Sequence, residues 1–212
     1  MILSLLFREP TIFLAWLIAI IFGITIHEFS HALGANLLGD RTPKYEGRLT
    51  LNPLAHLDFL GFMVLLFAGF GWGKPVTYNP FNLKNRRWGP VLVSLFGPLS
   101  NFVALLIFGF ALKILLAYTG LGAENMLIIF LVALIHINLV LGIFNLIPIP
   151  PLDGHHVLYA FLPPSADSFK QSFERSGPML LLGLIVLDSF LGLSIFSSVF
   201  EAASNVIFRI FG

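Results

Sequence analysis

Long apolar runs separated by short polar segments dominate this chain. The first run extends from about Thr11 to Leu38, the second from about Gly89 to Tyr118, and the third from about Asn125 to Ile147. A helix needs about 20 residues to cross a bilayer core that is ~30 Å thick, and each run is long enough. The pattern therefore predicts three long membrane helices.

The remaining apolar runs are shorter or interrupted. Residues 60–70 are too few to cross a bilayer, which favours a core helix or a re-entrant segment. Residues 178–211 contain charged positions and a glycine at 192, so we expect two short helices there. Partial alternation in residues 47–53 favours a short strand or hairpin. We predict an all-α polytopic membrane protein with about five to six membrane helices and a short membrane-embedded β-hairpin or re-entrant segment near residues 45–70.

Composition agrees with this class. Of the 212 residues, 57% are hydrophobic and 11% are charged, whereas soluble domains carry roughly 25% charged residues. The chain has too little polar surface to cover a soluble core of this size. The net charge of +1 does not suggest a nucleic-acid partner. The absence of cysteine excludes disulfides, thiol nucleophiles and cysteine-ligated zinc.

Basic residues are distributed unevenly between the loops. The loops 39–60, 71–88 and 163–177 hold nine of the twelve lysines and arginines, and the loop 118–124 holds none. The positive-inside rule therefore predicts that the basic loops are cytoplasmic and that the N-terminus lies outside. The first apolar run lacks an A-x-A cleavage site, so we interpret it as a retained span rather than a signal peptide.

The first apolar run contains the pattern H-E-x-x-H, from His27 to His31. Residues four apart share one face of a helix, so both imidazoles can hold one zinc ion while Glu28 acts as general base. Charged residues within membrane spans are costly and rare, which favours a functional site over a structural polar cluster. A hydrolytic zinc site also needs a third protein ligand and an open position for water.

Asp153 is a candidate for the third ligand. It follows a proline-rich segment, residues 148–151, and precedes Gly154. These prolines end the preceding helix, and irregular backbone at membrane depth is tolerated only beside protein or a water-filled cavity. The local pattern fits a metal ligand and an N-cap of the next helix equally well.

These motifs together resemble the site-2 protease family of intramembrane zinc metalloproteases. The resemblance rests on H-E-x-x-H at 27–31 and on N-x-x-P followed by P-P-L-D-G at 145–154. Two further stretches, GRLTLNPLAH at 47–56 and GPLSN at 97–101, also match the family. The resemblance implies one zinc ion per chain, held by His27, His31 and Asp153. It further implies that Glu28 is the general base and that Asn145 holds or polarises the substrate carbonyl.

The resemblance also implies a substrate class and a location. Substrates would be transmembrane segments of other proteins, cleaved within the cell membrane in regulated intramembrane proteolysis. The orientation predicted from the basic loops, with the N-terminus outside, places the active site toward the cytoplasmic side. The expected hairpin at 47–58 would offer an edge to the unwound substrate. We expect one metalloprotease domain over residues 1–212, and its catalytic core should span about residues 11–162. Membrane lipid would surround this domain. No stretch is long and polar enough for the PDZ or CBS domain that many members carry.

A metal transporter or a non-proteolytic metal-binding scaffold is the alternative function, and Glu28 argues against it because transport requires no general base. Asn101 and Asn138 lie in apolar runs, and we expect them to join helices through hydrogen bonds of about 1 kcal/mol rather than to take part in chemistry. His155 and His156 are expected to support the neighbouring ligand or to begin a helix.

Overall fold

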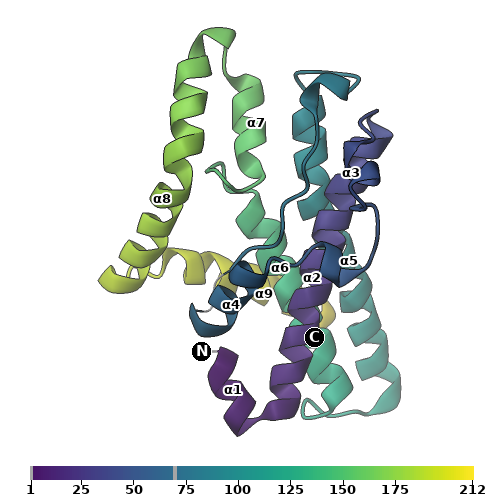
Figure 1. Cartoon of the computed structure of the whole chain (residues 1–212). Helices are drawn as coiled ribbons and strands as arrows, with labels where there is room; N and C mark the ends of the chain where they lie inside the picture. The colour runs from purple at the N-terminus through teal and green to yellow at the C-terminus, as the bar shows by residue number, and fades with distance from the viewer. Residues whose placement is uncertain (1, 69–70) are drawn as a thin grey trace.

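A computed structural model of the chain describes residues 2–68 and 71–212, and within these residues the regular elements are all helical (Figure 1). In chain order the elements are α1 (Ile2–Arg8), α2 (Pro10–Leu37), α3 (Thr42–Tyr45), η1 (Pro53–Ala55), α4 (Phe59–Ala68), η2 (Pro80–Asn82), α5 (Gly89–Thr119), α6 (Met126–Asn145), α7 (Gly154–Phe161), η3 (Pro164–Ala166), α8 (Asp167–Leu191) and α9 (Ile195–Phe211).

The helices α2, α5 and α6 form the centre of the molecule and run alongside one another (Figure 1). In the described part of the chain these three are long and apolar enough to cross a membrane. They confirm the three long runs of the sequence, with ends that differ by at most two residues. Helix α6 ends at Asn145, three residues before Pro148, because proline cannot continue the backbone hydrogen bonds.

Small and branched apolar side chains close the contacts between these helices. Ala19 of α2 and Ala133 of α6 are fully buried where these two helices meet. Their small side chains let the two backbones approach closely. On the other side of α6, Leu105 and Ile135 pack against Phe211 near the end of α9. The outward faces of α5 and α6 keep large exposed apolar side chains, such as Phe110. Such surfaces indicate contact with lipid rather than with water.

The expected β-hairpin near residues 45–70 is absent from the described residues. Helices α3 and α4 and the short helix η1 occupy this region, and one isolated antiparallel bridge joins Leu57 to Gly73. The side chain of Asn52 accepts a hydrogen bond from Leu54 N and starts a helical turn where the strand was expected. The Arg48 guanidinium donates to the carbonyls of Ala55, Lys74 and Pro75. These side-chain bonds replace the ladder that a hairpin would have formed.

A buried carboxylate fixes the loop that follows α2. Asp40 accepts hydrogen bonds from Thr42 N and Oγ1, Asn79 N and Asn82 Nδ2, at 2.7 to 3.1 Å. Burial by itself would raise the pKa of Asp40, but hydrogen bonds from Asn82, Thr42 and Asn79 outweigh burial and lower the pKa below its usual value. Asp40 thus stays ionised and joins the end of α2 to the segment that leads into α5.

The C-terminal region confirms one expectation and corrects another. The predicted break occurs at residues 192–194, where Gly192 and Ser194 adopt left-handed backbone angles. Asp188 accepts a hydrogen bond from Ile195 N at 2.7 Å and thereby ties α8 to α9. Residues 163–177 were expected to be a polar loop, but residues 167–177 form the first part of α8. Its polar residues favour a solvent-exposed helix, and Pro178 is accommodated within that helix.

Candidate metal centre

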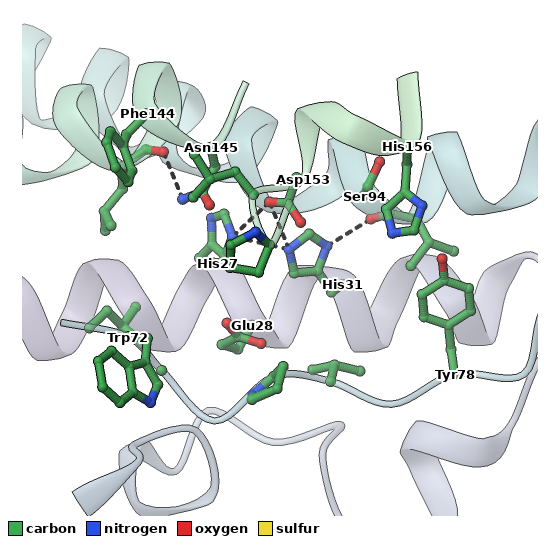
Figure 2. Close-up of a pocket in the computed structure, with 18 of the residues that line it drawn as sticks. His27, Glu28, His31, Trp72, Tyr78, Ser94, Phe144, Asn145, Asp153 and His156 are labelled. Carbon is green, nitrogen blue, oxygen red and sulfur yellow. Dashed lines mark hydrogen bonds and ion pairs between the residues drawn. The ribbon is translucent and has the colours of Figure 1, made fainter. Parts of the chain in front are cut away.

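Three side chains from two distant parts of the chain meet at one point beside α2 (Figure 2). The Oδ2 atom of Asp153 lies 3.1 Å from Nε2 of His27 and 3.2 Å from Nε2 of His31. The two Nε2 atoms are 3.0 Å apart. Both histidines are buried, and the side chain of Asp153 is 18% exposed. The structure therefore brings together the three residues for which the sequence suggested a ligand role.

Hydrogen bonds on the far side of each ring fix which nitrogen carries the proton. His31 Nδ1 lies 2.8 Å from the carbonyl oxygen of Val93, which can only accept, so Nδ1 carries the proton. His27 Nδ1 lies 2.7 Å from Asn101 Oδ1, which is also an acceptor. Both Nε2 atoms consequently present lone pairs toward Asp153.

The orientation of Asn101 follows from its own partners. Its Nδ2 donates to Asn138 Oδ1 at 2.9 Å and to the Gly23 carbonyl at 3.2 Å, which leaves Oδ1 to face His27. Asn138 Nδ2 in turn donates to the Leu134 carbonyl at 2.8 Å. A continuous chain of hydrogen bonds from α6 through α5 therefore orients the ring of His27 on α2.

The geometry of the three atoms fits a zinc ion. Two imidazole lone pairs and a carboxylate oxygen repel one another at about 3 Å unless a cation lies between them, and Asp153 Oδ2 is buried without a hydrogen-bond donor among the described residues. Tetrahedral zinc with bonds of 2.0–2.1 Å places its ligand atoms about 3.3 Å apart. Nitrogen and oxygen donors of this kind are ligands that zinc prefers.

Close packing of α5 makes room for these rings. Gly97 faces the two imidazoles, and a Cβ atom at this position would collide with both. Asn101 lies four residues later on the same face of α5, where it meets His27. The GPLSN stretch thus supplies one residue that admits the rings and one that orients a ring. Sequence reasoning assigned Asn101 to helix contacts only, and the spacing from Gly97 was the available signal for its second role.

The segment around Asp153 directs its side chain into the site. Asp153 occupies the N-cap position of α7, but its side chain makes no capping hydrogen bond and is directed toward the histidines instead. Gly154 allows the turn to fold back tightly, because a Cβ atom there would collide with the Leu146 carbonyl. Between the two alternatives left open by the sequence, the geometry favours the ligand.

Glu28 and Asn145 lie beside the three candidate ligands, in the same cavity of about 390 Å³, which is called the metal cavity below. Glu28 projects toward the extended segment 71–79 (Figure 2), and its Oε2 atom is buried without a hydrogen-bond partner among the described residues. Asn145 donates one hydrogen bond from Nδ2 to the Leu141 carbonyl at 3.0 Å. The second hydrogen of that amide remains available to a bound molecule.

The extended segment 71–79 forms the wall of the metal cavity opposite the three candidate ligands. Trp72 lies at one end of this wall and Tyr78 at the other (Figure 2). Burial, and then the charges of Asp153 and Glu174, raise the pKa of Tyr78 to about 12. The phenol therefore remains protonated and can donate a hydrogen bond at any physiological pH.

Replacing Asn101 with Ala should weaken zinc binding without removing a ligand. The substitution removes the acceptor that binds Nδ1–H of His27. The ring can then rotate, and the proton is no longer held on Nδ1. We expect a loss of zinc affinity of about 10- to 100-fold, the usual effect of removing a residue that orients a ligand. Competition with a calibrated chelator measures this. Asn125→Ala, which removes an N-cap of α6 and costs about 1 kcal/mol of stability, is the control and should leave zinc affinity unchanged.

The chain is similar to proteins named as zinc metalloproteases along most of its length. The profile of peptidase family M50 matches residues 113–184. The chain is 39% identical to YwhC of Bacillus subtilis over 201 residues, which cover 92% of this chain and 89% of that protein. It is 30% identical to Rip2 of Mycolicibacterium smegmatis over 174 residues, 77% of this chain and 63% of Rip2. Both relatives are named as candidate zinc metalloproteases.

A shorter match joins the chain to a relative named as a protease. RseP of Photorhabdus luminescens is 37% identical over 79 residues, which cover 34% of this chain and 35% of that protein. No solved structure matches the chain.

Proposed function

The chain belongs to peptidase family M50, the site-2 protease family of zinc metalloproteases, and we propose that it cleaves peptide bonds within transmembrane segments of other membrane proteins. One observation carries the proposal. The lone pairs of His27 and His31 and the carboxylate of Asp153 converge within 3.2 Å beside a long apolar helix, and the unpaired carboxylate of Glu28 lies in the same cavity.

The ligand set leaves room for catalysis. A zinc ion held by His27, His31 and Asp153 would lower the pKa of a bound water toward about 7 and polarise the scissile carbonyl. Glu28 is the proposed general base: it takes a proton from the attacking water and later passes it to the leaving amine. Its buried Oε2 atom supports this role, because among the described residues no donor occupies the lone pair that would accept the proton.

Two groups of the metal cavity can hold the substrate carbonyl. The free amide hydrogen of Asn145 supports the role proposed for this residue, because it lies in the same cavity as the ligands. Tyr78 offers a hydroxyl that stays protonated at the opposite wall. Donors placed where negative charge develops lower the barrier of acyl transfer.

The substrate must lose its helical hydrogen bonds before its carbonyls become accessible. The extended segment 71–79 is the proposed template for the unwound chain, in place of the hairpin expected at 47–58. Its inner part is anchored, since Lys74 N donates to the His56 carbonyl at 2.7 Å and Arg48 binds the carbonyls of Lys74 and Pro75. An anchored extended segment can pair with a second one without unfolding itself.

An apolar cavity next to the metal cavity supports a membrane substrate. This cavity has a volume of about 610 Å³ and shares Ile24, Trp72 and Phe144 with the metal cavity. Helices α2, α4, α6, α8 and α9 contribute to its walls. An apolar segment can therefore lie in this cavity while the adjoining unwound residues reach Glu28.

The finer membrane arrangement is also part of this proposal. The chain forms one metalloprotease domain in the cell membrane, with its catalytic core at about 11–162 and with the N-terminus outside. Helices α8 and α9 also associate with the membrane beside the three long helices, which gives five of the about five to six membrane helices expected from the sequence. The exposed apolar side chains of α8, such as Met179 and Phe190, support this arrangement.

Cleavage of a single-span reporter tests the function. We expect the purified protein in detergent to contain one zinc ion per chain and to cut the reporter within its apolar segment. A chelator should abolish cleavage, and zinc should restore it. Zinc binding without cleavage of any reporter would instead favour the metal-binding scaffold or transporter.

A further inference from the structure

A third cavity lies beyond Tyr78, on the side of the metal cavity away from Trp72. It has a volume of about 800 Å³ and shares Tyr78 and His156 with the metal cavity. It is called the basic cavity below, because its charged lining residues are Arg86, Arg87, Lys170 and Asp167. These residues come from the loop before α5 and from the first turn of α8.

The positive charges of the basic cavity exceed its negative charge. Lys170 and Asp167 form an ion pair at 3.0 Å and offset each other. Arg87 donates to the Ala160 carbonyl from Nε and Nη2, at 3.0 and 2.9 Å. Arg86 lies over the ring of Phe81, 5.5 Å from its centroid. Within the described chain, no carboxylate lies within 4 Å of either arginine. Glu174 acts electrostatically on Tyr78 and Tyr159 in the cavity wall. It forms no ion pair with Arg86 or Arg87, and the guanidinium of Arg86 makes no hydrogen bond to the described chain.

The three cavities follow one another along a single extended segment. Residues 71–79 begin at the apolar cavity, line the metal cavity and end at the basic cavity, where Tyr78 and Pro80 form part of the wall. Six residue steps from Trp72 to Tyr78 correspond to about 20 Å of extended chain. A substrate paired along this segment would therefore enter the basic cavity within about six residues of the cut.

We propose that the basic cavity is a subsite for an acidic side chain of the substrate, located on the cytoplasmic flank of the cleaved segment. This inference rests on the proposed function and specifies its substrate class. Opposite charges that approach in a partly enclosed cavity attract each other more strongly than on an open surface. Arg86 contributes most directly, since Arg87 is already committed to the Ala160 carbonyl.

The subsite would also exclude most other membrane proteins. Cytoplasmic flanks of membrane helices are enriched in lysine and arginine. Such a flank would place like charges opposite Arg86 and Arg87, and juxtaposed like charges disfavour binding. The basic cavity therefore separates substrates from the bulk of single-span proteins by repulsion as well as by attraction.

A charge-exchange experiment tests this subsite. Reporters carry Glu, Gln or Lys at each of six successive positions on the cytoplasmic side of the cut. Each reporter is cleaved by the wild type, by Arg86→Glu and by Lys84→Glu. Lys84 is the matched control, because it lies in the same exposed loop and outside the three cavities. Binding of the same reporters to Glu28→Gln is measured in parallel, so that recognition is read independently of chemistry.

The subsite predicts a reversal of preference. For the wild type, kcat/KM should be highest for Glu and lowest for Lys at one position, or at two positions two residues apart, with about a threefold to tenfold range. Arg86→Glu should reverse this order, and Lys84→Glu should not change it. Binding to Glu28→Gln should follow the wild-type order even if no reporter is cut, which separates this proposal from the proteolytic function.

Two outcomes would overturn the subsite. The first is a wild-type preference that does not depend on the charge of any flanking position, in cleavage and in binding. The second is an equal loss for all three reporters in Arg86→Glu, because a residue that contacts lipid headgroups or supports the fold would affect every substrate alike. Repeating the assay in nanodiscs with and without anionic lipid then identifies the lipid contribution.

Discussion

Glu28→Gln should abolish cleavage while zinc stays bound. Glutamine has nearly the shape of glutamate, and Glu28 is not among the three residues whose ligand atoms converge. The amide cannot accept the proton of the attacking water, so the chemical step loses its general base. A positioned base contributes about 10²- to 10⁴-fold, and we expect kcat to fall within or beyond that range. Reporter cleavage and metal analysis on the same sample measure the two effects.

The control is a matched substitution outside the site. Glu124 is exposed in the loop between α5 and α6, and Glu124→Gln should retain both zinc and activity. If Glu28→Gln keeps more than a tenth of the wild-type kcat, another group must act as base. If it loses zinc, Glu28 belongs to the ligand set, and the convergence of three residues alone would be an incomplete description of the centre.

Of the about five to six membrane helices expected, the sequence predicted the three long ones well, because their signal is local. Run length and apolarity alone define α2, α5 and α6, whose ends lie within two residues of those expected. The loop predicted at 163–177 was wrong, because the first two turns of α8 are polar and resemble a loop in sequence. The strand at 47–53 was also wrong, since Arg48 bonds to carbonyls as far away as Pro75. The residues 47–53 do not by themselves reveal these distant contacts.

The candidate site shows the same division between local and distant information. The H-E-x-x-H spacing places His27 and His31 on one helix face, so their proximity follows from the helix itself. Whether Asp153 caps α7 or faces the histidines depends on how the turn after α6 folds back. The contact between Asn101 and His27 spans 74 residues and depends on how α5 packs against α2. Helix packing of this kind leaves only a weak trace in a single sequence.

Asp153→Ala should remove zinc and activity together. The substitution leaves two imidazoles on one helix and removes the one carboxylate among the three candidate ligands. A structural zinc site is stabilised by about 10–16 kcal/mol over all its ligands, so losing one of three protein ligands should weaken binding by about 10³-fold. Metal analysis after dialysis should find wild-type protein loaded and Asp153→Ala empty, with no reporter cleaved.

Thermal unfolding separates a lost ligand from a damaged fold. A metal that binds only the native state stabilises it by about 4 kcal/mol at a concentration a thousand times its Kd. Zinc should therefore raise the Tm of stripped wild-type protein and leave that of Asp153→Ala unchanged. Asp58→Ala is the control, because Asp58 accepts a hydrogen bond from Gly61 N in the first turn of α4. This variant should unfold at a lower temperature yet keep the full response to zinc.

An undiminished response in Asp153→Ala would mean that the two histidines hold the metal with a different third partner. His156, which lines the same cavity, would then be the first residue to replace.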